Sequence, residues 1–390
     1  MTTTLIQNAR LLTCERDIAV TTGSLAIRDG LIAFVGEVPS DFVAEHVIDA
    51  KGALVTPGLV DCHTHAVFAG DRGAEFEMRA AGKAYQEIQA AGGGINASLG
   101  PTRKAIVDGS IDQILFDRIA RMMRGGSTTI EVKSGYALTT LGELALLDTI
   151  ANVATHTSAR LVPTLLAHLV PPERRADRDQ FVREICEQWI PQANAKAVDV
   201  WCEEAAFTLA ETRSILDAAK RAGKRVKGHV GQLNDIGGAE LFAEYGALSV
   251  DHLEYVSDAA IGRLANAGTV AVMLPGACVQ LRLPAPPVGK LRAAKVPMAV
   301  ATDLNPGTSW SEHLPMQMWL ATTHFQLTVE EAWLGVTTHA ARALGLDDVG
   351  VLKPGARGDC VIWNCDRPVD VCYRMGESLV TQVIANGAVV

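Results

Sequence analysis

Two histidines separated by one residue follow a strongly apolar stretch of this chain. The apolar segment at 53–55 and the Pro57-Gly58 turn signal lead into His63 and His65. Side chains two residues apart on a strand lie on the same face, so both imidazoles are predicted to point the same way. Such a pair is typical of half of a transition-metal site. Chance pairing on a solvated strand is the alternative, and the apolar residues before the pair count against it.

Other predicted strands also end on side chains that bind metals. His229 closes an apolar stretch, His252 follows residues 248–251, and Asp303 follows residues 298–302. Each is weak alone, because a histidine at a strand end is more often a hydrogen-bonding residue than a ligand. Taken together, three imidazoles and one carboxylate suit a single zinc or iron ion with room left for water. The predicted ligands are His63, His65, His229 and Asp303, and His252 is expected beside the ion as a hydrogen-bond donor.

The middle of the chain contains elements that could hold these residues together. Short apolar strands alternate there with helical patterns such as 144–154 and 210–222, which is typical of βα units. Eight candidate strands end near residues 65, 133, 168, 202, 229, 252, 274 and 303. The pattern predicts an α/β fold, a (β/α)8 TIM-like barrel over residues 57–345 with its site at the carboxyl ends of the strands.

Two regions depart from this alternation. Residues 76–126 are long for one crossover and include the glycines at 92–94, which predict a loop because no Lys-Ser/Thr pair follows them. Both chain ends, 1–56 and 346–390, carry short alternating segments broken by turns, which is typical of a β-meander. We therefore expect the two ends to meet in one small β-sandwich domain.

Composition narrows the class of protein. The chain has 390 residues, 48% hydrophobic and 20% charged, and a net charge of −9, which argues against non-specific nucleic-acid binding. No apolar run approaches the ~20 residues that span a bilayer, so no membrane partner is expected. The N-terminus lacks signal-peptide features, and the eight cysteines include no CxxC pair. We expect reduced thiols in a cytoplasmic protein that acts on a small molecule.

Several short motifs give the chain a family resemblance over essentially its whole length. It resembles the imidazolonepropionases, ring-opening hydrolases of histidine degradation within the amidohydrolase superfamily. His-x-His marks only the superfamily, whereas several of the other motifs are specific to the family. Those motifs are Phe68–Arg72, Gly92–Ile95, Glu131–Tyr136, Ala167-His168 with Pro171-Pro172, His229–Leu233, Asp251–Glu254 and Ala301–Gly307.

The resemblance implies a reaction and a set of residues. Water activated by one metal ion would open the lactam ring of 4-imidazolone-5-propanoate and give N-formimidoyl-L-glutamate. Asp303 would move the proton and His252 would stabilise the oxyanion. The substrate pocket would be lined by Arg72, Tyr136, His168, Gln232, Asn305, Gly307 and Thr308, and the family suggests a homodimer. The alternative for Arg72 is a surface salt bridge with Asp71 or Glu75.

The sequence departs from related patterns at two places. Position 232 is Gln where some family members carry Glu, so the base is expected to be Asp303, while Gln232 can still hydrogen-bond the ring amide. The strand-four segment 201–204 lacks the carboxylated Lys of two-metal amidohydrolases, which favours a single metal. Lys133 is either a buried ion-pair residue or a direct catalytic group, and Arg103 is a further carboxylate-binding candidate.

Two other functions fit parts of this pattern. Cytosine or guanine deaminases and dihydropyrimidinase-type hydrolases share the metal frame, and only the pocket residues distinguish them. A catalytically inactive barrel that serves as a scaffold would lose its metal ligands first, and this chain keeps the whole set.

Overall fold

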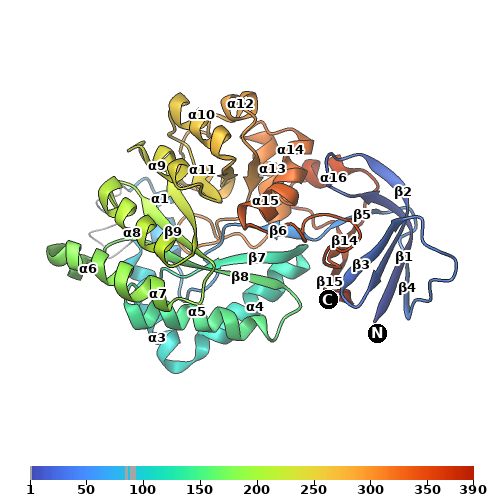
Figure 1. Ribbon diagram of the computed structural model, residues 1–390, viewed down its shortest axis with the longest axis horizontal. Helices are drawn as coiled ribbons and strands as arrows, with labels where there is room; N and C mark the ends of the chain where they lie inside the picture. Colours follow the sequence, from blue (N-terminus) through green and yellow to red (C-terminus); the bar gives the residue numbers. More distant parts are fainter. Residues whose placement is uncertain (1, 84–86, 88–93) are drawn as a thin grey trace.

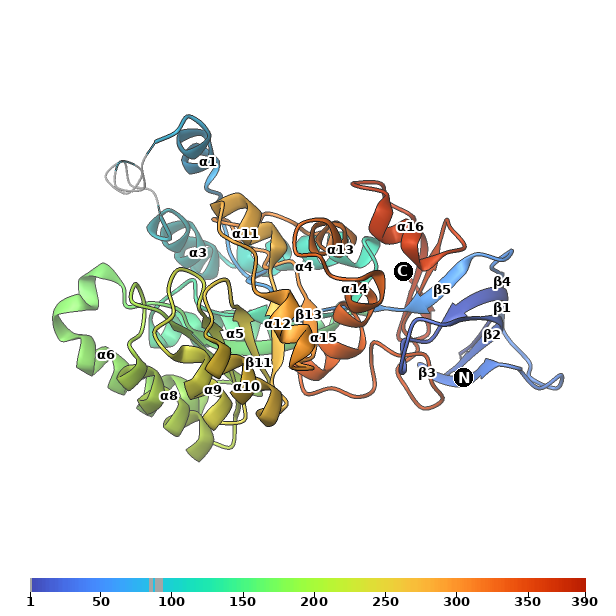
Figure 2. The ribbon, with the colours of Figure 1, turned by 90° about the horizontal axis from the view of Figure 1, so that it is seen from above.

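The computed structural model describes residues 2–83, 87 and 94–390. Within this part of the chain, eight parallel strands form one sheet in sequential order, and helices cover its outer face (Figure 1, Figure 2). The predicted (β/α)8 barrel is confirmed. Its strands are β6 Leu59–Asp61, β7 Ser127–Lys133, β8 Arg160–Ala167, β9 Ala197–Cys202, β10 Arg225–Val230, β11 Ser249–His252, β12 Val270–Met273 and β13 Met298–Val300.

The barrel closes just beyond its first and last strands. A parallel bridge joins Thr64 to Leu304, and backbone hydrogen bonds join His65 N to Leu304 O at 2.9 Å and Asp303 N to His63 O at 3.0 Å. Most predicted strand ends agree to within about one residue, but β6 and β13 end several residues early. His63 and His65 therefore lie on the extended segment that seals the barrel.

The helices of the barrel alternate with its strands. The helical patterns predicted at 144–154 and 210–222 correspond to α5 Thr140–Ala154 and α8 Leu209–Arg221. Thr208 accepts a hydrogen bond from the Glu211 backbone N–H, and the Glu211 side chain bonds back to Thr208, so α8 begins at a capping box. The helices up to β13 are α1 Gly73–Ala80, α3 Asn96–Asp108, α4 Ser110–Arg124, α5 Thr140–Ala154, η1 Pro172–Asp177, α6 Arg178–Glu184, η2 Ile185–Trp189, α7 Ile190–Gln192, α8 Leu209–Arg221, α9 Gly238–Glu244, α10 Asp258–Ala267, α11 Pro275–Leu281 and α12 Val288–Ala293.

The long connection after β6 contains α1, α3 and α4, as the predicted excursion suggested. Gly92 and Gly93 of the glycine trio lie outside the described residues. After the barrel, the chain continues through α13 Leu314–Thr323, α14 Val329–Gly335, α15 Thr338–Ala343 and α16 Pro368–Tyr373. None of the described helices is both long enough and apolar enough to cross a membrane.

Strands from both chain ends form a second, mixed sheet beside the barrel, and both termini lie in it (Figure 1). The predicted β-rich domain from the two ends is confirmed, and its strands are linked in one continuous sheet. Its boundaries at 56 and 346 stay a prediction. The strands are β1 Thr3–Leu12, β2 Val20–Arg28, β3 Leu31–Gly36, β4 His46–Asp49, β5 Leu54–Pro57, β14 Cys360–Trp363, β15 Val380–Ala385 and β16 Ala388–Val389.

The join between the two ends of the chain is at β5. This strand pairs parallel with β1 and antiparallel with β14. Trp363 of β14 is buried, and its indole Nε1 donates to Thr56 Oγ1 at 2.9 Å. Because β6 follows β5 after one residue, the chain-end sheet holds the start of the strand that leads to the two histidines.

Candidate metal centre and active site

Three imidazole nitrogens and one carboxylate oxygen converge inside the barrel where it closes. Asp303 Oδ1 lies 3.4 Å from His63 Nε2 and 3.4 Å from His65 Nε2. His229 Nε2 lies 3.3 Å from His65 Nε2. All four side chains are buried. The structure thus brings His63, His65 and Asp303 together as one possible metal-binding group, with His229 beside His65.

These separations match a metal site. Ligand atoms about 2.0–2.2 Å from a zinc ion, arranged tetrahedrally, lie about 3.3–3.6 Å from one another. His63 Nε2 is buried and has no hydrogen-bond partner among the described residues. A buried nitrogen in this state is costly unless something binds its lone pair. The donor set of three nitrogens and one oxygen therefore fits zinc or iron.

Carboxylates on other barrel strands bind the ring nitrogens of His63 and His229 that face away from the site. His63 Nδ1 donates to Asp251 Oδ2 at 2.6 Å, and His229 Nδ1 donates to Asp199 Oδ1 at 2.9 Å. With the proton on Nδ1, each ring presents the lone pair of its Nε2 to the site. Two such lone pairs facing the same space favour a cation between them.

The pKa shifts of three of these groups suit metal binding, and that of His63 opposes it. Burial lowers the pKa of His229 to about 4, and burial also lowers the pKa of His65 well below its ordinary value. Burial alone would raise the pKa of Asp303, but the imidazoles of His63 and His65 hold it well below its usual range. For His63 the carboxylates of Asp251 and Asp303 outweigh burial and raise the pKa. Asp303 is therefore a charged ligand at neutral pH.

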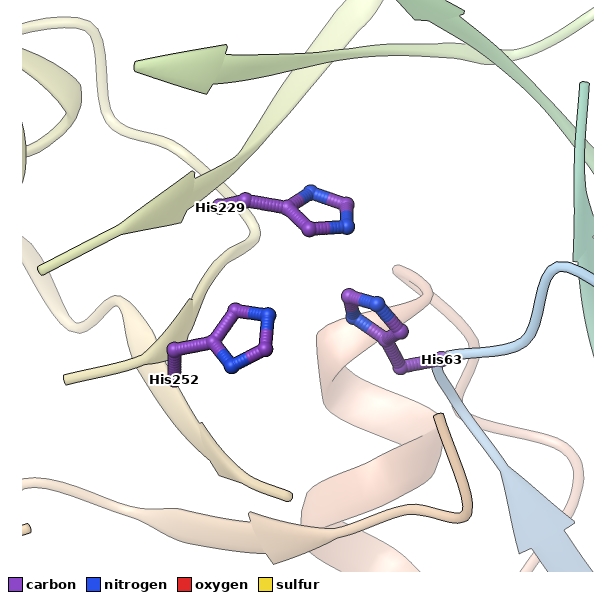
Figure 3. Close-up of side chains that lie close together, drawn as sticks. All are labelled: His63, His229 and His252. Carbon is purple, nitrogen blue, oxygen red and sulfur yellow. The ribbon is translucent and has the colours of Figure 1, made fainter. Parts of the chain in front are cut away.

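His252 adds a fourth imidazole to the same space. Its ring lies 5.9 Å from that of His63 and 5.5 Å from that of His229, and the three rings point toward one another (Figure 3). One ring nitrogen of each lies close enough for the three to share an ion. His252 Nδ1 is buried, has no hydrogen-bond partner in the described chain and lies 3.8 Å from Glu254 Oε1.

The backbone at two of these positions is in the left-handed region. His252 has φ 84° and Asp303 has φ 49°. Residues with a side chain seldom adopt this conformation, and it costs about 1–3 kcal/mol where it occurs. Its presence at both strand ends indicates that the fold fixes the direction of these side chains at the expense of stability.

Arg72 is held by a carboxylate and faces the loop after β13. Its Nε and Nη2 donate to Glu75 at 2.8 and 2.6 Å, so the salt-bridge alternative is present, although Glu75 is buried. The third nitrogen, Nη1, lies against Gly307, where an added Cβ would be 2.0 Å away. A side chain at position 307 would displace this end of Arg72, and Nη1 is the guanidinium nitrogen that Glu75 leaves available.

Tyr136 and His168 border the metal ligands. The His168 ring stacks on His65 with centroids 5.5 Å apart, and the Tyr136 ring lies 5.9 Å from His65. His168 Nδ1 donates to Gly135 O at 3.0 Å, which leaves its Nε2 as an acceptor. Burial lowers the pKa of His168 to about 4, so this imidazole is neutral at neutral pH.

Asn305 shapes the loop that follows β13. Its Nδ2 donates to Asp303 O at 2.7 Å and to Thr308 Oγ1 at 2.9 Å. Its Oδ1 accepts from the backbone N–H groups of Gly307 and Thr308 at 2.8 and 2.7 Å. The side chain thus holds Gly307 and Thr308 beside Asp303, and its own hydrogen-bonding capacity is used within the loop.

Gln232 follows a tight turn after His229. Gly231 has φ 63°, and a Cβ there would lie 2.2 Å from Tyr255 O. Only glycine therefore fits at position 231. Glu203 Oε1 accepts from the backbone N–H groups of Gln232 and Leu233 at 2.7 and 3.2 Å. Gln232 is buried at this turn.

The two basic residues left open by the sequence have different surroundings. Lys133 is fully buried, with its Nζ 2.5 Å from Asp199 Oδ2, which agrees with the ion-pair interpretation. Arg103 Nε donates to Ala137 O at 2.7 Å, and its Nη2 lies 3.6 Å from Glu173 Oε1.

Sequence reasoning missed the acids that hold the metal-facing histidines. Asp199 and Asp251 are buried within β9 and β11. An ionisable residue within a buried strand needs a partner. The sequence therefore predicts that each acid has a partner but does not identify that partner.

Comparison with known proteins agrees with this geometry. Residues 54–390 match the model of the amidohydrolase family. An imidazolonepropionase of Photorhabdus laumondii is 44% identical, over 95% of this chain and 92% of that protein. An imidazolonepropionase of Salmonella paratyphi A is 43% identical, over 99% of this chain and 98% of its own length.

Solved structures share the fold at low identity. A mutant atrazine chlorohydrolase of Arthrobacter aurescens, complexed with zinc and atraton, superposes with a TM-score of 0.76 at 16% identity, covering 99% of this chain and 94% of its own. An N-isopropylammelide isopropylaminohydrolase of Burkholderia multivorans gives a TM-score of 0.73 at 18% identity, covering 100% and 98%.

Proposed function

Since this chain belongs to the amidohydrolase family, and within it to the imidazolonepropionases, we propose that it opens the ring of 4-imidazolone-5-propanoate. The reaction hydrolyses the cyclic amide C–N bond and gives N-formimidoyl-L-glutamate, a step of histidine degradation. One observation carries the proposal, namely the metal-like spacing of buried ligand atoms, with the guanidinium of Arg72 against Gly307 in the loop that follows Asp303. That arrangement offers both a hydrolytic centre and a cation for a substrate carboxylate.

The proposed cofactor is one divalent ion, zinc or iron. His63, His65, His229 and Asp303 would hold it, and the spacing of their ligand atoms supports this assignment. When bound, the ion would supply Lewis acidity, which lowers the pKa of water toward ~7. Lys133 is ion-paired with Asp199, and the strand-four segment 201–204 has no lysine that could be carboxylated, which supports a single-metal site.

Asp303 is the proposed proton carrier. Its pKa is held well below the usual range, so Asp303 is a carboxylate at neutral pH. In the proposed step it accepts the proton that water loses as it adds to the amide carbonyl. The C–N bond then breaks, and Asp303 returns that proton to the leaving nitrogen. Gln232 cannot take this role because an amide does not accept a proton at neutral pH.

His252 is the proposed hydrogen-bond donor to the carbonyl oxygen. Its ring faces the metal ligands, and its strained backbone supports a fixed direction. A donor lowers the energy barrier of the reaction only if it already points toward the developing oxyanion. The fold holds His252 in such a fixed direction. Loss of such a donor typically costs ~10²–10³ in turnover.

The remaining pocket residues are proposed to bind the substrate. Arg72 Nη1 would bind the propanoate, and the planar guanidinium is kept in place by Glu75. The other pocket positions are assigned to Tyr136, His168, Gln232, Asn305, Gly307 and Thr308, and Asn305 acts there by holding Gly307 and Thr308 in place. The closeness of Tyr136 and His168 to His65 supports these assignments.

We also propose a homodimer in the cytoplasm whose partner is this small molecule. Family membership supports the dimer, and light scattering on the purified protein tests it. All eight cysteines are free thiols, which supports a reducing compartment. The net charge of −9 argues against a nucleic-acid partner.

The experiment is a substrate comparison on the purified, metal-loaded protein. We expect loss of imidazolone absorbance at an enzymatic rate, with N-formimidoyl-L-glutamate as the product identified by mass spectrometry. Cytosine, guanine and hydantoin should be turned over at least ~10³-fold more slowly, because each of them needs other polar partners in the pocket. Faster turnover of any of the three than of the imidazolone would overturn the proposal.

A further inference from the structure

Inside the barrel, one buried ammonium group touches three carboxylates. Lys133 is the last residue of β7, and its side chain is fully buried. Its Nζ lies 2.5 Å from Asp199 Oδ2, 2.9 Å from Glu131 Oε2 and 3.7 Å from Asp251 Oδ2. The reaction proposed above gives this group no role.

Two of these carboxylates are the acceptors for the metal-facing histidines. Asp199 uses Oδ1 for His229 Nδ1 and Oδ2 for Lys133. Asp251 uses Oδ2 for His63 Nδ1 at 2.6 Å, and the same oxygen faces Lys133. Lys133 therefore links the ligand histidine of β10 to the one after β6, through acids on β9 and β11.

The ammonium also fixes the place of both acids. Asp199 and Asp251 are fully buried, and a buried carboxylate is stable only with partners close by. Burial alone would lower the pKa of Lys133, but Asp199, Glu131 and Asp251 outweigh it and raise that pKa above its ordinary value. Lys133 stays charged in this surrounding.

We infer that Lys133 is a positioning residue of the metal centre, whose ammonium pairs with Asp199 and Asp251, fixes where these acceptors lie and thereby orients His229 and His63 toward one ion. The inference rests on the metal site of the proposed function. Lys133 acts through the acids and does not touch the ion. Partners of metal-bound histidines typically change metal affinity 10–100-fold when they are removed.

Lys227 provides a matched control within the same barrel. It is also buried, and its Nζ contacts the other oxygen of Glu131 at 2.9 Å and Cys62 O at 2.9 Å. In the described part of the chain, Lys227 forms no ion pair with Asp199 or Asp251. Replacing either lysine by methionine removes one buried charge beside Glu131, and the charge of Lys227 also acts on Asp251 from farther away. Only the change at Lys133 removes an ion pair with Asp199 and Asp251.

The experiment measures metal binding to the full-length protein. Zinc affinity is determined by chelator competition, and the cobalt(II)-substituted protein reports ligand geometry through its visible absorption bands. For Lys133→Met we expect zinc binding 10–100-fold weaker than wild type and a changed cobalt spectrum. For Lys227→Met we expect zinc affinity within about threefold of wild type and an unchanged spectrum.

Two results would overturn the inference. One is a Lys133→Met protein with wild-type zinc affinity and cobalt spectrum, and the other is equal weakening in both variants. If Lys133→Met does not fold by circular dichroism, Lys133→Gln replaces it with the same expectations, because glutamine keeps polar partners without the charge.

The same data separate this inference from the proposed function. A wild-type protein that binds one ion tightly but leaves the imidazolone intact would contradict the function, and the lysine comparison would still stand. A wild-type protein that is active, with a metal site indifferent to Lys133, would contradict only the inference.

Discussion

The interior of the barrel and the core of the chain-end sheet contain opposite kinds of side chain. Near the carboxyl ends of the barrel strands, charged residues and imidazoles are buried together, among them Lys133, Asp199 and Asp251. The core of the chain-end sheet is aliphatic, with Leu25 and Ile384 fully buried within it.

The difference shows which region supplies stability and which supplies chemistry. Apolar burial stabilises a fold by about 25 cal/mol per Å². Buried charges lose solvation, and well-packed apolar residues in their place are often as stable or more stable. The barrel therefore carries a polar interior for the sake of its metal ligands, while the chain-end sheet holds the start of β6 in place.

The largest expected effect on activity without an effect on stability comes from Asp303→Asn in the barrel. It removes a charged ligand and the proposed proton carrier, so we expect kcat to fall by ~10²–10⁴. Because the neutral amide keeps the size of the side chain, the urea unfolding midpoint of the barrel should change little. Near-normal turnover with one ion bound would show that Asp303 does not move the proton.

The opposite effect is expected in the chain-end sheet. Leu25→Ala leaves a cavity in an aliphatic core and should lower the free energy of unfolding by ~2–5 kcal/mol, while kcat and metal content stay at wild-type values. Urea unfolding and steady-state kinetics on the same preparation measure both. Val43→Ala, at a residue 82% exposed, is the control with no expected effect. A large loss of kcat in the folded Leu25→Ala protein would contradict the division of roles.

A change at Arg72 tests substrate binding separately from proton transfer in the barrel and from the stability of the chain-end sheet. Arg72→Lys keeps the charge but loses the planar fork, so KM should rise ~10–100-fold with a smaller change in kcat. Arg79 also pairs with Glu75 and has no contact with Gly307 in the described structure. Arg79→Lys is the matched control, and an equal rise in KM there would remove Arg72 from the pocket.

The smallest effect concerns a buried imidazole outside the site. His339 of α15 donates from Nδ1 to Met298 O at 2.9 Å, and burial lowers its pKa. Below pH ~6.5 the unfolded chain takes up a proton that the folded chain does not, so stability falls as pH falls. At pH 5.5 this costs at most about 1.4 kcal/mol.

His339→Gln should therefore flatten the loss of stability between pH 7.5 and pH 5.5 in urea unfolding. His46→Gln, at an exposed residue, is the control and should keep the wild-type slope. An unchanged slope in His339→Gln would contradict the role of burial.

Sequence alone predicted the parts of this protein that depend on local pattern. Strand ends such as Lys133, Cys202 and His252 followed from apolar runs, and the ligands followed from polar residues placed after them. The bridge between Thr64 and Leu304, about 240 residues apart, could not be predicted because no local pattern specifies it. The same holds for Asp251, whose partner His63 lies on another strand, and for Glu75, whose hold on Arg72 needs the fold of α1.

The central claim is that four side chains from three strand ends share one ion. Anomalous scattering from crystals of the metal-loaded protein, recorded at the zinc and iron edges, tests it directly. We predict one peak about 2.0–2.2 Å from His63 Nε2, His65 Nε2, His229 Nε2 and Asp303 Oδ1. No peak after metal loading, or a peak away from these four atoms, would contradict the account.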